Sequence, residues 1–270
     1  MKIKSYTKEY IRKSDNHLYI APDKELRHCI AHYTITFQNK DKVIPKGTVL
    51  HIIPDLSGCI VMPLHPDIKM RMWGPMTKAV TLNNDLNTAE HRFFIEFLPG
   101  GLYSFLPKSM DAFVDNKIEL DELLPELYEE FTTIINTSTT YDRMVERINN
   151  VCKNYIKRNK EDRIYREFIK AVQEDDFTTS SLSNQFQVSE RQIHRYFKKY
   201  IGISGTAYKK IMNLNRLLPT LDDTSLTDIA HQNEYFDQAH FNHVFKEICK
   251  ATPTKYIHNL SEFYNEIYKF

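Results

Sequence analysis

The sequence predicts an α+β protein. A strand-rich, barrel-like or sandwich N-terminal domain with attached helices is followed by an all-α domain with two helix-turn-helix motifs. Three observations predict this fold. Short β-branched and aromatic runs, separated by Pro, Gly, Asp and Asn, recur up to about residue 116. The apolar residues change to a helical period from about Leu120, and the C-terminal part contains an imperfect internal repeat. We place the two domains at residues 1–159 and 160–270.

The predicted strands of the N-terminal domain are short and rich in residues that favour sheets. Alternation is clearest in the last of them, where Phe93, Ile95 and Phe97 share one face. Several short strands separated by turn residues are typical of a sandwich or a small barrel. The runs are His32–Phe37, Gly47–Pro54, Gly58–Met62, Lys78–Leu82 and His91–Gly101.

Two helices are predicted between Leu120 and Arg158, and Pro125 interrupts the first of them. The second helix carries an apolar stripe at helical spacing. Such a stripe usually packs on its own domain, and pairing with a second copy of the chain is the sharper alternative. The polar segment Arg158–Asp162 is predicted to be a hinge between the domains. The stripe consists of Met144, Ile148, Val151 and Tyr155.

The composition is typical of a globular protein of 270 residues, and its net charge of +1 does not by itself indicate a nucleic-acid partner. No apolar run is long enough to cross a membrane, and the polar N-terminus does not resemble a signal peptide. We therefore expect a cytoplasmic protein with no membrane partner. The cysteines contain no CxxC pair, which argues for reduced thiols. They are Cys29, Cys59, Cys152 and Cys249.

The internal repeat predicts a short helix, a tight turn and a second helix, present twice. In the first copy Leu182–Phe186 is the short helix, and Ser189 caps the second helix in a capping box with Gln192. In the second copy Leu226–Gln232 is the short helix and Asp237 is the N-cap. The positions that match at a separation of 48 are Ile193 with Phe241, Arg195 with His243, Phe197 with Phe245, Gly202 with Lys250, Ser204 with Thr252 and Tyr208 with Tyr256.

Burying the apolar stripe of each second helix leaves a polar face outward, and we call these helices the first and second reader. Arg, Gln and Asn match the donor and acceptor patterns of purine edges in the major groove of DNA, while Lys and Arg hold phosphates. A helical linker over Thr206–Leu218 could hold the readers one turn of duplex DNA apart, about 34 Å. A solvated helix face is the alternative. The candidate base-reading residues are Arg191, His194, Arg195, Gln238, Asn242 and His243, and the candidate phosphate ligands are Ser189, Lys198, Lys199 and Lys246.

The segment Phe177–Ile257 resembles the AraC/XylS family of bacterial transcription regulators. The first copy tracks the family pattern at Ser189, Arg191, Ile193, Arg195, Phe197, Gly202 and Tyr208. The second copy carries the family's signature segment at Ile229-Ala230, Tyr235, Asp237-Gln238, His240-Phe241, Phe245-Lys246, Thr252-Pro253 and Tyr256. The resemblance implies a sequence-specific DNA-binding transcription regulator that is not an enzyme. It also implies control by an N-terminal sensor or dimerisation domain. The implied partners are double-stranded DNA, a small-molecule effector, a second copy of the chain and, for an activator, RNA polymerase.

Four positions depart from the family pattern. Gln187, Glu234 and Lys250 stand where the family usually has Gly, and His243 stands where it usually has Arg. A weaker or pH-sensitive second reader would follow from these changes. The alternative function is therefore an interaction or binding protein whose degenerate DNA-binding domain lacks sequence specificity.

The N-terminal domain resembles, less specifically, the sensor half of some of these regulators. Asp55, Trp73 and Glu96 are candidates for an effector cavity. Alternatively, Asp55 makes a turn, Trp73 is a core residue and Glu96 faces solvent.

A zinc site is the competing interpretation of the second reader, which holds His231, His240, His243 and Cys249 in or near it. However, His243 belongs to the face expected to meet DNA, the family pattern accounts for His240, and Cys249 has no CxxC partner. We therefore expect no bound metal, no cofactor and no catalytic residue.

Overall fold

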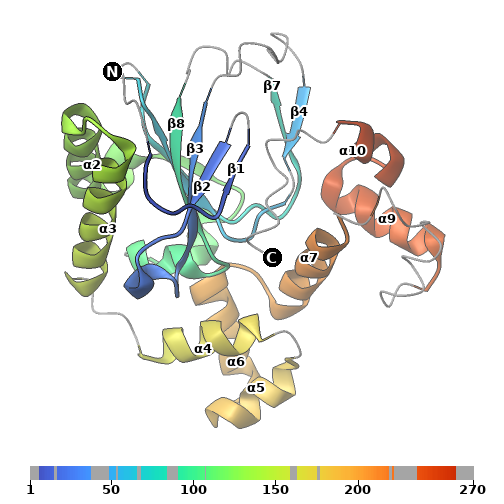
Figure 1. Cartoon of the computed structure of the whole chain (residues 1–270). Coiled ribbons are helices and arrows are strands. Elements are labelled where there is room, and N and C mark those ends of the chain that lie inside the picture. Colours follow the sequence, from blue (N-terminus) through green and yellow to red (C-terminus); the bar gives the residue numbers. More distant parts are fainter. Residues whose placement is uncertain are drawn as a thin grey trace.

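A seven-stranded antiparallel sheet is the centre of the N-terminal region in the computed structural model (Figure 1). The structure describes residues 6–14, 17–37, 49–52, 54–65, 68–83, 91–106, 108–158, 163–174, 177–218, 221 and 236–259. The strand order is β1-β2-β3-β8-β5-β6-β9, and β4 and β7 form a separate two-stranded sheet. The strands are β1 Arg12–Lys13, β2 His17–Ile20, β3 Ile30–Thr36, β4 Val49–Ile52, β5 Cys59–Pro63, β6 Arg71–Trp73, β7 Val80–Asn83, β8 Arg92–Phe97 and β9 Lys117–Glu119.

Helices follow and flank these strands. In the N-terminal region they are η1 Lys24–Leu26, η3 Gly101–Phe105, η4 Met110–Phe113, α1 Leu120–Leu123, α2 Pro125–Thr137 and α3 Tyr141–Arg158. In the C-terminal region they are α4 Arg163–Gln173, α5 Thr179–Phe186, α6 Glu190–Tyr196, η5 Phe197–Ile201, α7 Gly205–Leu217, α9 Gln238–Cys249 and α10 Pro253–Asn259. Within the described part of the chain, no helix combines the length and apolar character needed to span a membrane.

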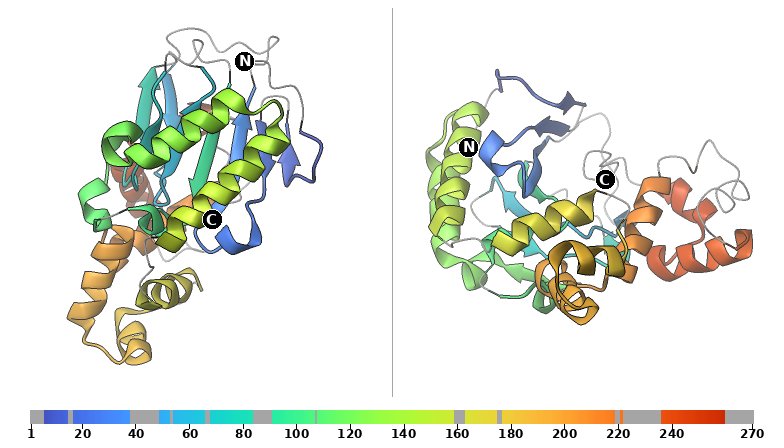
Figure 2. Two further views of the ribbon diagram at one scale, coloured as in Figure 1. Left: turned by 90° about the vertical axis from the view of Figure 1, so that its left-hand side faces the viewer. Right: turned by 90° about the horizontal axis from the view of Figure 1, so that it is seen from below.

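One face of the large sheet is apolar and covered by helices. Tyr33, Ile95 and Ile60 lie in register on the neighbouring strands β3, β8 and β5, and all three are fully buried. Helices α2 and α3 lie over this face, in front of the strands in the left view of Figure 2. The main core of the N-terminal region therefore sits between the sheet and these two helices.

The apolar stripe of α3 packs on this sheet. Met144 and Ile148 are fully buried, and Val151 and Tyr155 pack against the same core. Tyr155 also stacks on Phe105, with ring centroids 5.9 Å apart. The chain covers its own stripe, so the stripe is not a surface for pairing with a second copy.

The opposite face of the large sheet carries polar side chains that are also buried. His32 and Glu96 are register partners on β3 and β8, and both are at most 3% exposed. Tyr19 meets His32 edge-on at 5.5 Å and stacks on His17 at 5.9 Å. Thr34 is 3% exposed on the same face. The small β4–β7 sheet lies on this side, away from α2 and α3 (Figure 1).

Five of the strands, β3, β4, β5, β7 and β8, coincide with predicted runs, whereas β1, β2, β6 and β9 were not predicted. As predicted, the first helical run is broken at Pro125. It is the first residue of α2, where its missing N–H costs nothing, and α1 ends before it. Most of the predicted hinge, residues 159–162, and the predicted helix 226–232 lie outside the described residues.

The helical region packs directly against the N-terminal region. Leu56, from the loop between β4 and β5, is fully buried in the core of the helical region. The Tyr165 hydroxyl accepts a hydrogen bond from Ser104 Oγ and donates one to the Gly100 carbonyl, both at 3.0 Å. The Tyr103 ring lies 4.9 Å from that of Tyr165. The two regions therefore share buried contacts rather than being joined by a linker alone.

Candidate nucleic-acid interface

The first reader, α6, has the predicted N-cap, and the structure shows the Ser189 half of the predicted capping box. Ser189 is its N-cap, and the Ser189 Oγ accepts a hydrogen bond from the Gln192 amide at 3.3 Å. Gln187 ends α5 with a φ of 53°, in the left-handed region that Gly adopts at least cost. The turn between α5 and α6 therefore keeps a positive φ although no Gly is present.

The second reader, α9, has the predicted N-cap. The Asp237 Oδ1 accepts a hydrogen bond from the His240 amide at 2.7 Å. Phe241 and Phe245 are fully buried, and their ring centroids are 5.7 Å apart. Glu234 and the turn before this reader lie outside the described residues.

The two copies of the sequence repeat share backbone geometry at matching positions. Gly202, after the first reader, has a φ of 99°, and Lys250, after the second, has a φ of 58°. The following helix starts with the same 2.9 Å backbone hydrogen bond in each copy: Tyr208 N to Ser204 O, and Tyr256 N to Thr252 O. The repeat in sequence is thus a repeat in structure, and Lys250 adopts the conformation of its glycine counterpart.

Both readers turn polar and basic side chains to solvent. Helix α7 runs between them (Figure 1), close to the predicted linker Thr206–Leu218. The predicted contact residues that are exposed are Ser189, Arg191, His194, Arg195 and Lys198 in the first copy, and Gln238, His243 and Lys246 in the second.

Two predicted contact residues are less accessible. Lys199 is half-buried, and its Nζ lies 4.8 Å from the ring centre of Tyr200 and 5.8 Å from that of Tyr103 in the N-terminal region. A phosphate contact would therefore draw Lys199 away from an aromatic face that attracts cations. Asn242 is half-buried, and its Oδ1 is shielded from solvent.

Comparison with known protein families agrees with this geometry. Residues 182–259 match a family described as "Helix-turn-helix domain", which is the AraC-type form of the motif. This part of the chain therefore contains an AraC-type helix-turn-helix domain. Such a domain supports a DNA-binding transcription regulator and matches that class of protein rather than an enzyme. Residues 18–119 match a second family, described as "Domain of unknown function (DUF6597)".

Solved structures similar to this chain include two bacterial proteins. The C-terminal domain of AraT, a response regulator from Geobacillus stearothermophilus, is 22% identical; the match covers 38% of this chain and 93% of that one, with a TM-score of 0.32. ToxT from Vibrio cholerae O395 is 10% identical over 92% of this chain and 97% of its own, with a TM-score of 0.38. No curated protein matches the chain.

The residues that suggested a zinc site lie in different environments. Cys249 is fully buried, and burial raises its pKa to about 12, whereas His243 is exposed. His240 uses its Nδ1 to accept a hydrogen bond from the Phe236 amide at 3.2 Å. His231 lies outside the described residues. Among the residues that are described, no three His, Cys, Asp or Glu side chains gather as a metal site would require.

The three effector candidates also have different surroundings. Asp55 makes a turn, because its Oδ1 accepts a hydrogen bond from the Ser57 amide at 2.8 Å. Glu96 is 3% exposed on the polar face of the large sheet, so a solvent-facing position is wrong for it. Trp73 is half-buried on β6 and lies in the same row of the sheet as Glu96, with Cys59 between them.

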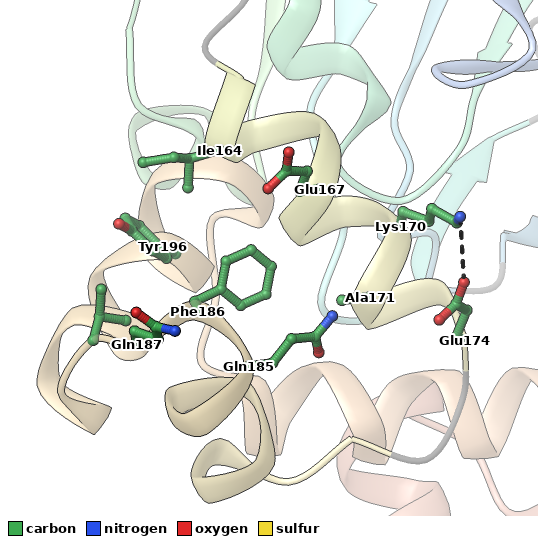
Figure 3. A pocket seen from close by; sticks show the side chains of 10 residues that line it. Ile164, Glu167, Lys170, Ala171, Glu174, Gln185, Phe186, Gln187 and Tyr196 are labelled. Carbon is green, nitrogen blue, oxygen red and sulfur yellow. Dashed lines mark ion pairs between the residues drawn. The ribbon is translucent and has the colours of Figure 1, made fainter.

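A cleft of about 500 Å³ lies beside the first reader, between α4 and the turn that joins α5 to α6 (Figure 3). Phe186, Ala171 and Tyr196 give it an apolar floor, and Lys170 and Glu174 pair at 3.9 Å on its rim. The residues that line this cleft include none of the predicted base-reading, phosphate or effector residues. The cleft is therefore separate from the face of α6 that carries the basic side chains.

Phe236 is a surface residue that the sequence reasoning missed. It lies two positions before α9, and it is 87% exposed. A large aromatic residue directly before the N-cap is the signal that could have drawn attention to it, because an apolar residue at that position usually packs on the first turns of its helix.

Proposed function

We propose that the chain recognises a specific sequence of double-stranded DNA with α6 and α9, and that its N-terminal region controls this binding. The observation that carries the proposal is the repeated geometry of the readers. Each is capped at its start, is followed by a residue with a positive φ (Gly202 or Lys250) and turns polar and basic side chains outward. Two such helices separated by α7 can enter successive major grooves.

The side chains on the readers have two kinds of task. Guanidinium groups match the O6 and N7 acceptors of guanine, and side-chain amides match adenine, so these groups read bases. Ammonium and hydroxyl groups hold the phosphates, which fix register and orientation. We assign base reading to Arg191, His194, Arg195, Gln238, Asn242 and His243, and phosphate binding to Ser189, Lys198, Lys199 and Lys246.

Selection of bound duplexes from a random pool, followed by affinity measurement, tests this proposal. Arg195→Ala should weaken binding to the selected site by about 1–3 kcal/mol, or roughly 5- to 150-fold. Arg163→Ala is the matched control, because Arg163 is an exposed arginine on α4, paired with Glu167 at 3.0 Å and away from the readers. Wild-type affinity should fall steeply with salt. Equal affinity of wild type and Arg195→Ala would refute the placement of α6 on DNA.

The alternative function is an interaction protein whose second reader no longer recognises bases normally, and two observations favour testing it. His243 stands on the exposed face where the family usually has Arg, and the Oδ1 of Asn242 is shielded. A normal second reader predicts selected duplexes with two half-sites one helical turn apart. A single half-site, or no enrichment at all, would favour an interaction protein that lacks full sequence specificity.

We further propose that an effector binds on the polar inner face of the large sheet. His32, Thr34 and Glu96 are buried there, on the side where the small sheet lies. A few polar groups placed on a buried face are characteristic of binding sites that fix a ligand's orientation. Glu96 and Trp73 stay candidates for such contacts, whereas the Asp55 side chain is occupied by its own turn.

The contacts between the regions support a route by which this sensor could move the readers. The small sheet reaches the second reader: the amide of Ala79, directly before β7, donates to the Ile248 carbonyl of α9 at 2.9 Å. Asn215 of α7 donates from its Nδ2 to the Pro54 carbonyl, after β4, at 2.8 Å. The first reader is attached elsewhere, since Ser109 Oγ donates to the Lys198 carbonyl at 3.4 Å. A change in the position of the small sheet relative to the large one would therefore shift one reader relative to the other.

Replacing Asn215 tests this coupling. Asn215 is 3% exposed, and Asn213 on the same helix is exposed, so Asn213→Ala is a matched control. Wild type and Asn213→Ala should prefer one half-site spacing. Asn215→Ala, having lost a hydrogen bond worth about 1 kcal/mol, should discriminate about fivefold less against a site with one added base pair. Unchanged spacing discrimination in Asn215→Ala would refute the route through α7.

Two further partners and a location complete the proposal. We propose a cytoplasmic protein whose dimerisation, if it accompanies DNA binding, uses a surface other than the covered stripe of α3. Sedimentation of the chain with and without its selected duplex measures this. For an activator, RNA polymerase is the expected further partner, and transcription from the selected site in a purified system tests it.

A further inference from the structure

Phe236 is the most exposed large apolar side chain in the described part of the molecule. It is 87% exposed, whereas Tyr10, Ile11 and Ile164 are between 40% and 49% exposed. Single apolar residues on a surface are ordinary, and most keep part of their side chain covered. An aromatic ring with almost none of its area covered contributes little to the stability of the fold. Its apolar surface can instead be buried against a binding partner.

The position of Phe236 is fixed at the entry of the second reader. Its amide donates a hydrogen bond to His240 Nδ1 at 3.2 Å, and Asp237 caps the same turn by accepting from the His240 amide at 2.7 Å. The backbone that carries the ring is thus tied to the first turn of α9 by two hydrogen bonds. Gln238, a predicted base-reading residue, is exposed two positions later.

The start of a recognition helix is the part that meets base edges when the helix lies in the major groove. The only apolar group that a base pair presents in that groove is the 5-methyl group of thymine, and Phe is one of the side chains that contact it. Such a contact discriminates thymine without any hydrogen bond. It also covers the ring, which is favourable in proportion to the apolar area removed from water.

We propose that Phe236 is a base-contacting residue of the second reader and packs against the 5-methyl group of a thymine. This inference rests on the proposed function, since it requires α9 to enter a major groove. It assigns the second reader an apolar contact that neither His243 nor Asn242 can make. Part of the sequence preference of α9 is then set by a methyl group rather than by hydrogen bonds.

Replacement of thymine by uracil tests this proposal, because uracil pairs in the same way and lacks only the 5-methyl group. The full chain is measured on its selected duplex with each thymine of the second half-site replaced in turn. At one position uracil should weaken wild-type binding about fourfold, the factor expected for one buried methyl group. Phe236→Ala should bind the thymine duplex about fourfold or more weakly, and it should no longer distinguish thymine from uracil at that position.

Two further variants keep the outcome interpretable. Ile164→Ala removes an exposed apolar side chain from α4, and it should keep the wild-type uracil effect. Phe236→Leu should keep part of the preference for thymine, because it still presents an apolar group. A wild type with no uracil-sensitive position, or a Phe236→Ala protein with the full wild-type uracil effect, overturns the proposal. If wild type selects no duplex at all, the proposed function fails. If wild type selects a duplex and Arg195→Ala binds it more weakly, the proposed function holds, and the uracil result then tests Phe236 alone.

Discussion

The buried imidazole of His17 makes the stability of the protein depend on pH in a way that can be calculated. His17 is 3% exposed on β2, and burial lowers its pKa from 6.5 to about 4. Below pH 6.5 the unfolded chain takes up a proton at this position and the folded chain does not. The unfolded state therefore binds more protons between pH 4 and 6.5, and the free energy of unfolding rises with pH across that window. One pKa unit corresponds to about 1.4 kcal/mol. As the pH falls, His17 therefore lowers the free energy of unfolding by about 3 kcal/mol over the whole window and by about 2 kcal/mol between pH 6.5 and 5.

Urea denaturation of wild type and His17→Gln at pH 7.5, 6.5, 5.5 and 5 measures this effect. Glutamine has a similar size and does not titrate in this range, so the pH slope, not the absolute stability, is the quantity to compare. His194→Gln changes an exposed histidine and is the matched control. Between pH 6.5 and 5, the free energy of unfolding of wild type and of the control should fall by about 2 kcal/mol more than that of His17→Gln. Parallel pH profiles for wild type and His17→Gln would refute a buried, neutral His17.

Three other changes follow from the backbone and the shared core. Lys250→Gly should raise the free energy of unfolding by about 0.5–1 kcal/mol in thermal denaturation, because relief from a φ of 58° outweighs the added freedom of Gly in the unfolded chain. Gly202→Ala should lower it by about 2–4 kcal/mol, since the φ is 99° and the new Cβ would lie 2.6 Å from Val114 Cγ2; an unchanged midpoint would contradict that strain. Tyr165→Phe, which loses two buried hydrogen bonds to the N-terminal region, should cost about 1–2 kcal/mol and raise hydrogen exchange in α4; exchange equal to wild type would show that these bonds do not hold the helix.

The readers could be predicted from the sequence because their signals are local. The N-caps at Ser189 and Asp237 and the buried rings of Phe241 and Phe245 follow from spacing within one helix. Because the sequence contains the motif twice, the helices assigned in one copy can be compared with the matching positions of the other. Even the departure at Lys250 was visible, although only the structure gives its positive φ.

The N-terminal region could be predicted less well because its decisive contacts join residues far apart in the chain. The very short strands β1, β6 and β9 have too few residues to show alternation, and their pairing depends on register with distant neighbours. Which sheet face holds Glu96, and that this face is buried, depends on what covers it. The position of Lys199 against Tyr103 likewise depends on packing between the two regions, which no local pattern encodes.

Leu56 makes the two halves of this regulator a matched pair rather than exchangeable modules. Its side chain comes from the strand-rich half and fills the interior of the helical half. A chimaera that joined the helical half to a different sensor would leave that space empty, at a cost comparable to a buried Leu→Ala change, about 2–5 kcal/mol. New sensor specificities can therefore arise by substitution inside this chain more readily than by recombination at its midpoint.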